Sequence, residues 1–136
     1  FDDVEMEFVA PDTFQIAPDL VQALEQSRVK IQKSDNLKEV LPDIDCVYMT
    51  RIQDEYDMSN ESGQINYDLF SLFPEDLKLM KADSIILHPL PRRSEIHPEV
   101  DLDPRAMYWR QLRNGLYIRA ALMLYIFNQS HRLQEY

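Results

Sequence analysis

Four short apolar runs divide the chain, and we predict that each forms a strand. Residues 4–9 alternate apolar and polar side chains, as a half-buried strand does. Residues 28–32 form a shorter run, in which Val29 and Ile31 point to the same side. Residues 45–49 and 84–88 are nearly continuously apolar, so we expect these two strands to be buried.

Helices are predicted between the strands. A helix over residues 18–26 begins at Pro18, because proline suits a first helical position. A shorter helix follows Asn36, which with Glu39 three residues later resembles a helix cap. Residues 67–73 and 74–80 form two further helical pieces. The side chains expected to face inward are Leu20, Ala23 and Leu24 in the first helix, and Leu37, Val40 and Leu41 in or next to the second.

The last third of the chain is predicted as a long loop followed by helix. The loop covers residues 93–104, and a helix begins near Pro104. Asn114-Gly115 either interrupts this helix or starts a new one. Residues 116–127 are apolar on almost every face, so this segment expects cover on most sides. Without that cover, we expect the segment to drive self-association or to lose its order.

Alternating strands and helices with short connections predict an α/β fold. We expect a parallel sheet of about four strands with helices on both faces, a Rossmann-like three-layer sandwich, with the C-terminal helix partly uncovered. The chain has 136 residues, which is one ordinary domain, and its 45% hydrophobic content argues against disorder.

Composition excludes several classes of function. The net charge of −10 argues against nucleic acid and against anionic membrane surfaces, and no apolar run reaches membrane-spanning length. The single Cys46 permits no internal disulfide, which fits a cytoplasmic protein. His97 and His131 lack metal-ligand spacing, so we predict no metal. With two glycines and no glycine-rich phosphate loop, a nicotinamide-binding domain or another cofactor is not expected either.

Candidate chemistry gathers where two of the predicted strands end. Residues 84–88 run into His88-Pro89-Leu90-Pro91-Arg92, and neither proline can donate to a ladder, so the strand must stop near His88. Residues 45–49 run into Thr50-Arg51-Ile52-Gln53. In an open α/β sheet, ligands bind outside the carboxyl ends of the strands. One edge therefore receives the side chains of Arg51, Gln53, Arg92 and Arg93.

Arginine is the usual clamp for carboxylate and phosphate groups, and six arginines lie between residues 92 and 119. Helix-surface charge and structural ion pairs account for most of them. Arg51 and Arg92 are set apart because they follow strand ends. For Arg51, a buried structural ion pair is the competing interpretation.

Three stretches in order carry a family resemblance. The sequences TRIQDE from Thr50, HPLPR from His88 and YWRQLRNGLYIRAALML from Tyr108 resemble the second half of aspartate carbamoyltransferase. The similarity begins at FVAPD, from Phe8, and covers most of the chain. The related ornithine enzymes usually carry a cysteine at the position of Pro89 and lack the TRxQ stretch. The resemblance therefore favours aspartate over ornithine.

The resemblance implies a role for each residue at the two strand ends. Arg51 would bind a substrate carboxylate and Gln53 would hydrogen-bond the substrate. Pro89 and Leu90 would accept hydrogen bonds from the amino group through their backbone carbonyls, and Arg92 would contact substrate or brace the loop. The Leu90–Pro91 bond would be cis, as in the family. Supporting roles would fall to Thr50, His88, Pro91, Glu95 and Arg119, with His88 a hydrogen-bonded structural histidine and no side chain assigned to catalysis.

The resemblance also implies a reaction and partners. Family enzymes form N-carbamoyl-L-aspartate and phosphate from L-aspartate and carbamoyl phosphate, in pyrimidine biosynthesis, and are homotrimers. An earlier domain with a Ser-Thr-Arg-Thr-Arg signature binds carbamoyl phosphate, and nothing in this sequence matches it. We therefore expect residues 1–111 to form the aspartate-binding domain, residues 112–136 to pack on the other domain, and the chain alone not to turn over. The alternative is a non-catalytic interaction module that retains the fold.

Overall fold

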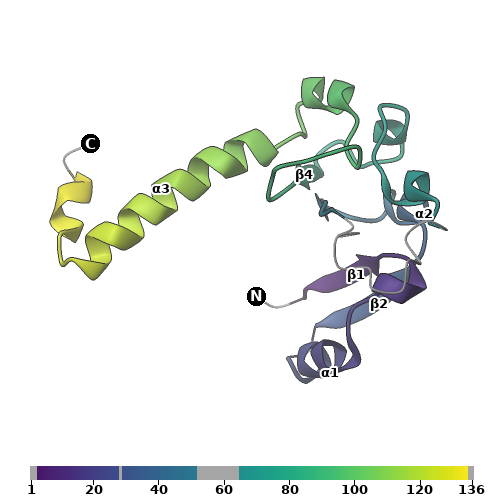
Figure 1. Cartoon of the computed structure of the whole chain (residues 1–136), viewed down its shortest axis with the longest axis horizontal. Helices are drawn as coiled ribbons and strands as arrows, with labels where there is room; N and C mark the ends of the chain where they lie inside the picture. The colour runs from purple at the N-terminus through teal and green to yellow at the C-terminus, as the bar shows by residue number, and fades with distance from the viewer. Residues whose placement is uncertain (1–2, 28, 52–64, 135–136) are drawn as a thin grey trace.

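The computed structural model describes residues 3–27, 29–51 and 65–134. Within these ranges four strands alternate with helices, so the α/β class expected from the pattern is confirmed (Figure 1). The strands are β1 (Glu5–Val9), β2 (Lys30–Ser34), β3 (Cys46–Tyr48) and β4 (Ile85–Leu87). The α-helices are α1 (Pro18–Gln26), α2 (Leu37–Val40) and α3 (Tyr108–Ile126), with 3-10 turns between them.

The strands pair in parallel, but as two pairs rather than one ladder of four. β1 pairs with β2 from Glu5↔Lys30 to Val9↔Ser34, and β3 pairs with β4 from Cys46↔Ile85 to Tyr48↔Leu87. The expected continuous sheet is therefore wrong in this detail for the described residues. β3 and β4 are only three residues long, and prolines soon after β4 remove the donors that would extend it.

Burial alternates along β3 and β4, which corrects the expectation of strands buried throughout. In and after β3, Val47 and Met49 are buried while Cys46 and Tyr48 are exposed. Around β4, Ser84, Ile86 and His88 are buried and the residues between them are half-buried. Successive side chains on a strand point to opposite faces, and only one face of this pair meets the core.

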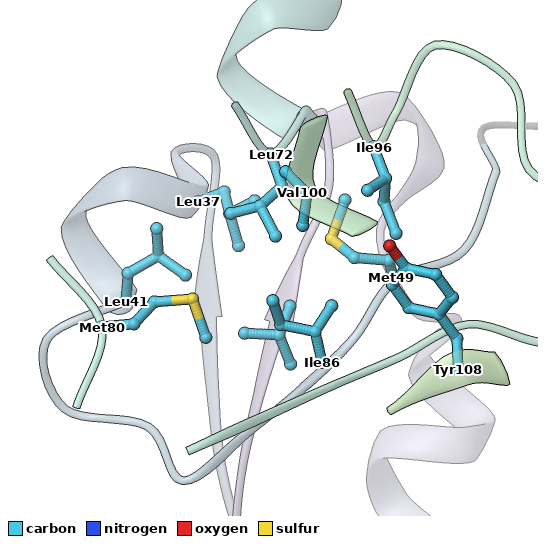
Figure 2. Close-up of a cluster of buried hydrophobic side chains, with 10 residues drawn as sticks. Leu37, Leu41, Met49, Leu72, Met80, Ile86, Ile96, Val100 and Tyr108 are labelled. Atoms are coloured by element: carbon cyan, nitrogen blue, oxygen red, sulfur yellow. The ribbon is translucent and has the colours of Figure 1, made fainter. Parts of the chain in front are cut away.

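The core packs around β4 and is closed by residues from α2, from the loops after it and from the start of α3. Ile86 has no exposed surface and lies between Met80 and Tyr108 (Figure 2). Its backbone also bonds the segment before α3. The N–H of Ile86 donates to the Arg105 carbonyl at 2.8 Å, and its carbonyl accepts from Met107 at 2.9 Å. The buried cluster is Leu37, Leu41, Val47, Met49, Leu72, Met80, Ile86, Ile96, Val100 and Tyr108.

The two short helices, α1 and α2, differ in how well their inward-facing side chains were predicted. α1 covers the predicted residues, but Leu20 is 55% exposed and Val21, not Leu20, turns inward beside Leu24. Ala23, also predicted to face inward, is exposed too, so of the three predicted residues only Leu24 is partly buried. α2 confirms its prediction: the Asn36 side chain accepts from the Lys38 N–H at 3.1 Å, and Leu37, Val40 and Leu41 are buried.

Short 3-10 turns replace several of the predicted longer pieces. The pieces expected over residues 67–80 are turns at Tyr67–Phe70 and Asp76–Lys78. The loop expected over residues 93–104 contains a further turn, Pro98–Leu102, which the His97 side chain caps by accepting from the Glu99 N–H at 3.2 Å.

α3 begins at Tyr108 rather than near Pro104 and runs without a break through Asn114-Gly115, so the predicted interruption was wrong. One glycine costs a helix interior only about 1 kcal/mol, which the rest of a 19-residue helix offsets. Figure 1 shows α3 leading away from the strands, and most of its apolar side chains are exposed, as expected. Neither α3 nor another helix among the described residues combines the length and hydropathy that a bilayer crossing needs.

The exposed apolar side chains of α3 predict self-association of this chain in solution. In α3 and directly after it, Ile118, Tyr125 and Phe127 are 69%, 72% and 66% exposed, and exposed apolar surface of this kind favours burial against another molecule. We expect sedimentation velocity to show association that increases with concentration and that Ile118→Lys with Phe127→Lys reduces. Leu102→Lys, at a residue 86% exposed outside the helix, should change nothing. A wild-type chain that stays monomeric across the concentration range contradicts the prediction.

Candidate functional site

The carboxyl ends of β3 and β4 lie side by side. The parallel register pairs Tyr48 with Leu87, and the Met49 N–H donates to the Leu87 carbonyl at 2.9 Å. The two loops predicted to carry the site, one from Thr50 and one from His88, therefore leave the sheet together. Thr50 is exposed and Arg51 is half-buried, whereas Gln53 lies outside the described residues.

His88 is buried and uses both of its ring nitrogens. Its Nδ1 accepts the N–H of Leu90 at 2.8 Å, and its Nε2 lies 2.7 Å from Oε1 of Glu95. Because a backbone N–H can only donate, Nδ1 is the unprotonated nitrogen and Nε2 carries the proton that it donates to Glu95. With both positions occupied within the loop, this ring has no position left to take a proton from substrate.

Glu95 holds the loop from its far side. Besides accepting from His88, its Oε1 and Oε2 accept the N–H of Arg93 at 3.1 and 3.0 Å. One carboxylate thus ties the start of the Pro89–Arg92 segment to its end. His88 and Glu95 are therefore hydrogen-bonded within the loop, and their supporting roles at the substrate site stay a prediction.

Leu90 lies at the tip of the loop in an unusual backbone conformation. Its φ is 56°, in the left-handed region, which costs a residue with a side chain about 1–2 kcal/mol. The hydrogen bond from its N–H to His88 helps to hold it there. The peptide bond to Pro91 is cis, as predicted. Among the described residues, no hydrogen bond ends on the carbonyl of Pro89 or of Leu90, the two acceptors proposed for a substrate amino group.

The Arg92 guanidinium is held by an ion pair, a hydrogen bond and two aromatic rings. Its guanidinium forms a two-pronged ion pair with Asp101, with Nη2 at 2.7 Å from Oδ2, and Nη1 donates to the Tyr108 hydroxyl at 3.2 Å. The group also lies over the rings of Tyr108 and Trp109, 5.6 and 5.7 Å from their centroids. Of its two predicted roles, contact with substrate or support of the loop, this arrangement favours support.

Arg92, Asp101, Tyr108 and Trp109 form a group, the Arg92 cluster, in which neighbouring side chains shift one another's pKa values. Hydrogen bonding to Asp101 raises the pKa of Arg92 further. Partial burial alone would raise the pKa of Asp101, but hydrogen bonds from Arg92, Tyr108 and Trp109 outweigh it and lower that pKa below 3.8. Burial and the Asp101 carboxylate together raise the pKa of Tyr108, so its hydroxyl stays protonated.

Acid should weaken the fold through Asp101 and a second carboxylate, Asp103. The hydrogen bond from Arg105 lowers the pKa of Asp103, with its Nε 2.9 Å from Oδ1. Since both folded pKa values lie below the unfolded one, both carboxylates stabilise the fold above about pH 4 and lose that contribution as pH falls through the folded values. We expect urea midpoints to drop as the pH falls below about 4, less steeply in Asp101→Asn. Equal slopes in wild type and variant would contradict this.

One predicted residue, Arg119, and a further arginine, Arg105, lie outside the group of side chains around Arg92. Arg119 is exposed on α3, eleven residues after Tyr108 and hence about 16 Å along the helix from the Arg92 cluster. Arg105, one of the six arginines between residues 92 and 119, pairs with Asp103 and donates to the carbonyls of Leu77, Met80 and Lys81.

Sequence reasoning missed the residues that brace the loop from α3 and the segment before it. They are Asp101, Tyr108, Trp109 and Gln111, and three of the four stand in the YWRQ stretch already quoted for the resemblance. No spacing rule pairs Asp101 with Arg92, because a turn in the chain brings them together.

A shallow hollow lies elsewhere, beyond the ends of β1 and β2. Asp12, Thr13 and Asp35 line it together with Pro11, Ile65, Asn66, Leu69 and Phe70. Its two carboxylates would repel a dicarboxylate, so the hollow does not compete with the β3–β4 edge as a site for such a ligand.

Comparison with known proteins identifies relatives of this arrangement. Residues 3–126 match the family model described as aspartate/ornithine carbamoyltransferase, Asp/Orn binding domain. The aspartate carbamoyltransferase catalytic subunit of Alkaliphilus oremlandii is 44% identical over 124 residues, which is 90% of this chain and 38% of that protein. The multifunctional protein CAD of Squalus acanthias is 40% identical over 120 residues, 88% of this chain and 5% of that protein.

Solved structures agree with the sequence relatives. Aspartate transcarbamoylase from Trypanosoma cruzi in complex with carbamoyl phosphate superposes with a TM-score of 0.80 at 31% identity, over 88% of this chain and 39% of that one. The same enzyme in complex with N-(phosphonacetyl)-L-aspartic acid gives 0.79 at 32% identity, with the same coverage. The chain therefore spans about two fifths of the length of these single-function relatives.

Proposed function

Since this chain belongs to the aspartate/ornithine carbamoyltransferase family through its Asp/Orn binding domain, we propose that it supplies the L-aspartate-binding part of an aspartate carbamoyltransferase. The observation that carries the proposal is the paired exit of β3 and β4, which delivers Thr50–Arg51 and His88–Arg92 to one edge of the sheet. The relatives named above include one enzyme solved both with carbamoyl phosphate and with N-(phosphonacetyl)-L-aspartic acid.

In the proposed reaction the amino nitrogen of L-aspartate attacks the carbonyl carbon of carbamoyl phosphate. A C–N bond forms, the C–O bond to phosphate breaks, and the amine loses a proton. Catalysis of this kind consists mainly of holding two anions together and orienting the amine. Arg51 binds a carboxylate of aspartate, Gln53 adds a hydrogen bond, and the carbonyls of Pro89 and Leu90 accept from the amino group. Arg92 acts mainly by holding the loop through Asp101.

Aspartate is favoured over ornithine by charge. A guanidinium at the strand end attracts the side-chain carboxylate of aspartate and repels the side-chain ammonium of ornithine. The relative from Alkaliphilus oremlandii named above is an aspartate carbamoyltransferase, which supports the same choice.

The remaining part of the reaction is assigned to partners. Carbamoyl phosphate is held by a domain outside this sequence, and residues 112–136, with the apolar side chains of α3, pack on that domain. The working enzyme is a homotrimer in the cytoplasm, where the free thiol of Cys46 stays reduced. By itself the chain binds the aspartate moiety but does not turn over.

The second candidate is a non-catalytic interaction module, favoured only by the exposed apolar face of α3. Such a module would associate through α3 and would have no need to bind aspartate analogues. Ligand binding therefore discriminates between the two proposals.

Calorimetric titration with N-carbamoyl-L-aspartate tests the proposed function. We expect the chain to bind, and Arg51→Ala to weaken the affinity about tenfold or more, as expected for loss of a charge-assisted hydrogen bond. Arg113→Ala is the matched control, because it removes an exposed arginine from α3 and should leave affinity unchanged. Absence of binding by the folded chain, or equal loss in both variants, contradicts the proposal.

A further inference from the structure

β4 has neighbours on both of its edges. β3 lies on one edge, and the segment Arg105–Met107 bonds the other through the backbone of Ile86. The N–H of His88 points to the same side as that of Ile86, because alternate residues of a strand share a direction. Beside His88, however, the segment Arg105–Met107 has already ended and α3 has begun, so this segment offers no further backbone carbonyl to continue the ladder.

Gln111 supplies the missing acceptor. Its Oε1 accepts the His88 N–H at 3.0 Å, in place of the next backbone rung. The other end of the same amide reaches β3, where Nε2 donates to the Tyr48 hydroxyl at 3.1 Å. The backbone of Gln111 is fixed in the first turn of α3 by a 2.8 Å bond to the Met107 carbonyl.

We propose that Gln111 is a positioning residue of the substrate site. Its amide joins the ends of the two strands that carry the site, and so fixes the Pro89 and Leu90 carbonyls relative to Arg51. Gln111 acts through His88, whose ring in turn holds Leu90. This inference rests on the proposed function for its ligand, but the coupling of the strand ends stands on the hydrogen bonds alone.

Two substitutions at one position test the proposal. Gln111→Met keeps the size of the side chain and removes both hydrogen bonds. Gln111→Glu keeps the acceptor for His88, and the Tyr48 hydroxyl can donate to the new carboxylate. We expect hydrogen exchange at the His88 and Leu90 amides to become about tenfold faster in the methionine variant and to return towards wild type in the glutamate variant. The Ile86 amide, bonded to Arg105, is the internal reference and should not change.

The affinity for N-carbamoyl-L-aspartate distinguishes positioning from simple support. We expect about a tenfold loss in Gln111→Met and recovery in Gln111→Glu. Unchanged exchange at His88 overturns the proposal, and so does faster exchange with unchanged affinity. If the wild-type chain does not bind the ligand, the proposed function is what fails. The coupling of the two strand ends is then tested by the amide chemical shifts of Thr50 and Arg51 in Gln111→Met. Changed shifts support the coupling, and shifts identical to those of the wild type overturn it.

Discussion

Ile86→Ala is expected to lower the free energy of unfolding by about 2–5 kcal/mol. Ile86 has no exposed surface and lies between Met80 and Tyr108 in the buried cluster (Figure 2), so removing three carbons leaves a cavity that its neighbours fill only in part. A domain of this size is stable by about 5–15 kcal/mol in all, so the loss is a large fraction. Urea unfolding followed by circular dichroism measures it.

Leu102→Ala is the control for that substitution. Leu102 is 86% exposed, and its truncation should change the free energy of unfolding by less than about 0.5 kcal/mol. If the two variants lose similar amounts, β4 is not the centre of the core and the account of the fold is wrong.

Asp101→Ala is expected to lower the free energy of unfolding by about 2–3 kcal/mol, the second largest of the predicted effects. The substitution leaves the Arg92 guanidinium and the Tyr108 hydroxyl without their shared acceptor. Breaking a fully buried ion pair costs about 3–5 kcal/mol, and this pair is partly exposed, with side chains 17% and 29% accessible, which reduces the figure. The Arg92 loop should also lose protection from hydrogen exchange.

Asp101→Asn separates charge from hydrogen bonding in this cluster. The amide keeps one acceptor oxygen, so we expect a smaller loss than in the alanine variant. Glu99→Ala removes an exposed carboxylate from the same 3-10 turn and should have almost no effect. A loss in Asp101→Ala no larger than in Glu99→Ala contradicts a bracing role for the pair.

The elements that were predictable from sequence are those with local causes. Pro18 at a first helical position and Asn36 at a cap determine where α1 and α2 begin, and the prolines after His88 end β4. The unbroken α3 was not predictable in this way. A turn preference at Asn114-Gly115 is local, whereas continuation of the helix depends on the residues on both sides of it.

The part of the site that was predictable from sequence is the part that lies at the strand ends and in the family motifs. The resemblance pointed to the two loops and to a cis Leu90–Pro91 bond, which the structure has. It did not reveal that Asp101 holds Arg92 or that Gln111 bridges the strand ends. Those contacts join residues that are distant in sequence, and only the packing of the turn and of α3 against β4 creates them.

The most direct test of the central claim is to locate the ligand on the chain by amide chemical-shift mapping. On titration with N-carbamoyl-L-aspartate, we expect the largest shifts at the amides of Arg51, Leu90 and Arg92, with little change along α3. The same titration with citrulline, the carbamoylated ornithine, should leave the chemical shifts of these amides unchanged. Shifts confined to α3 or to the hollow beside Asp12 would contradict an aspartate site at the ends of β3 and β4.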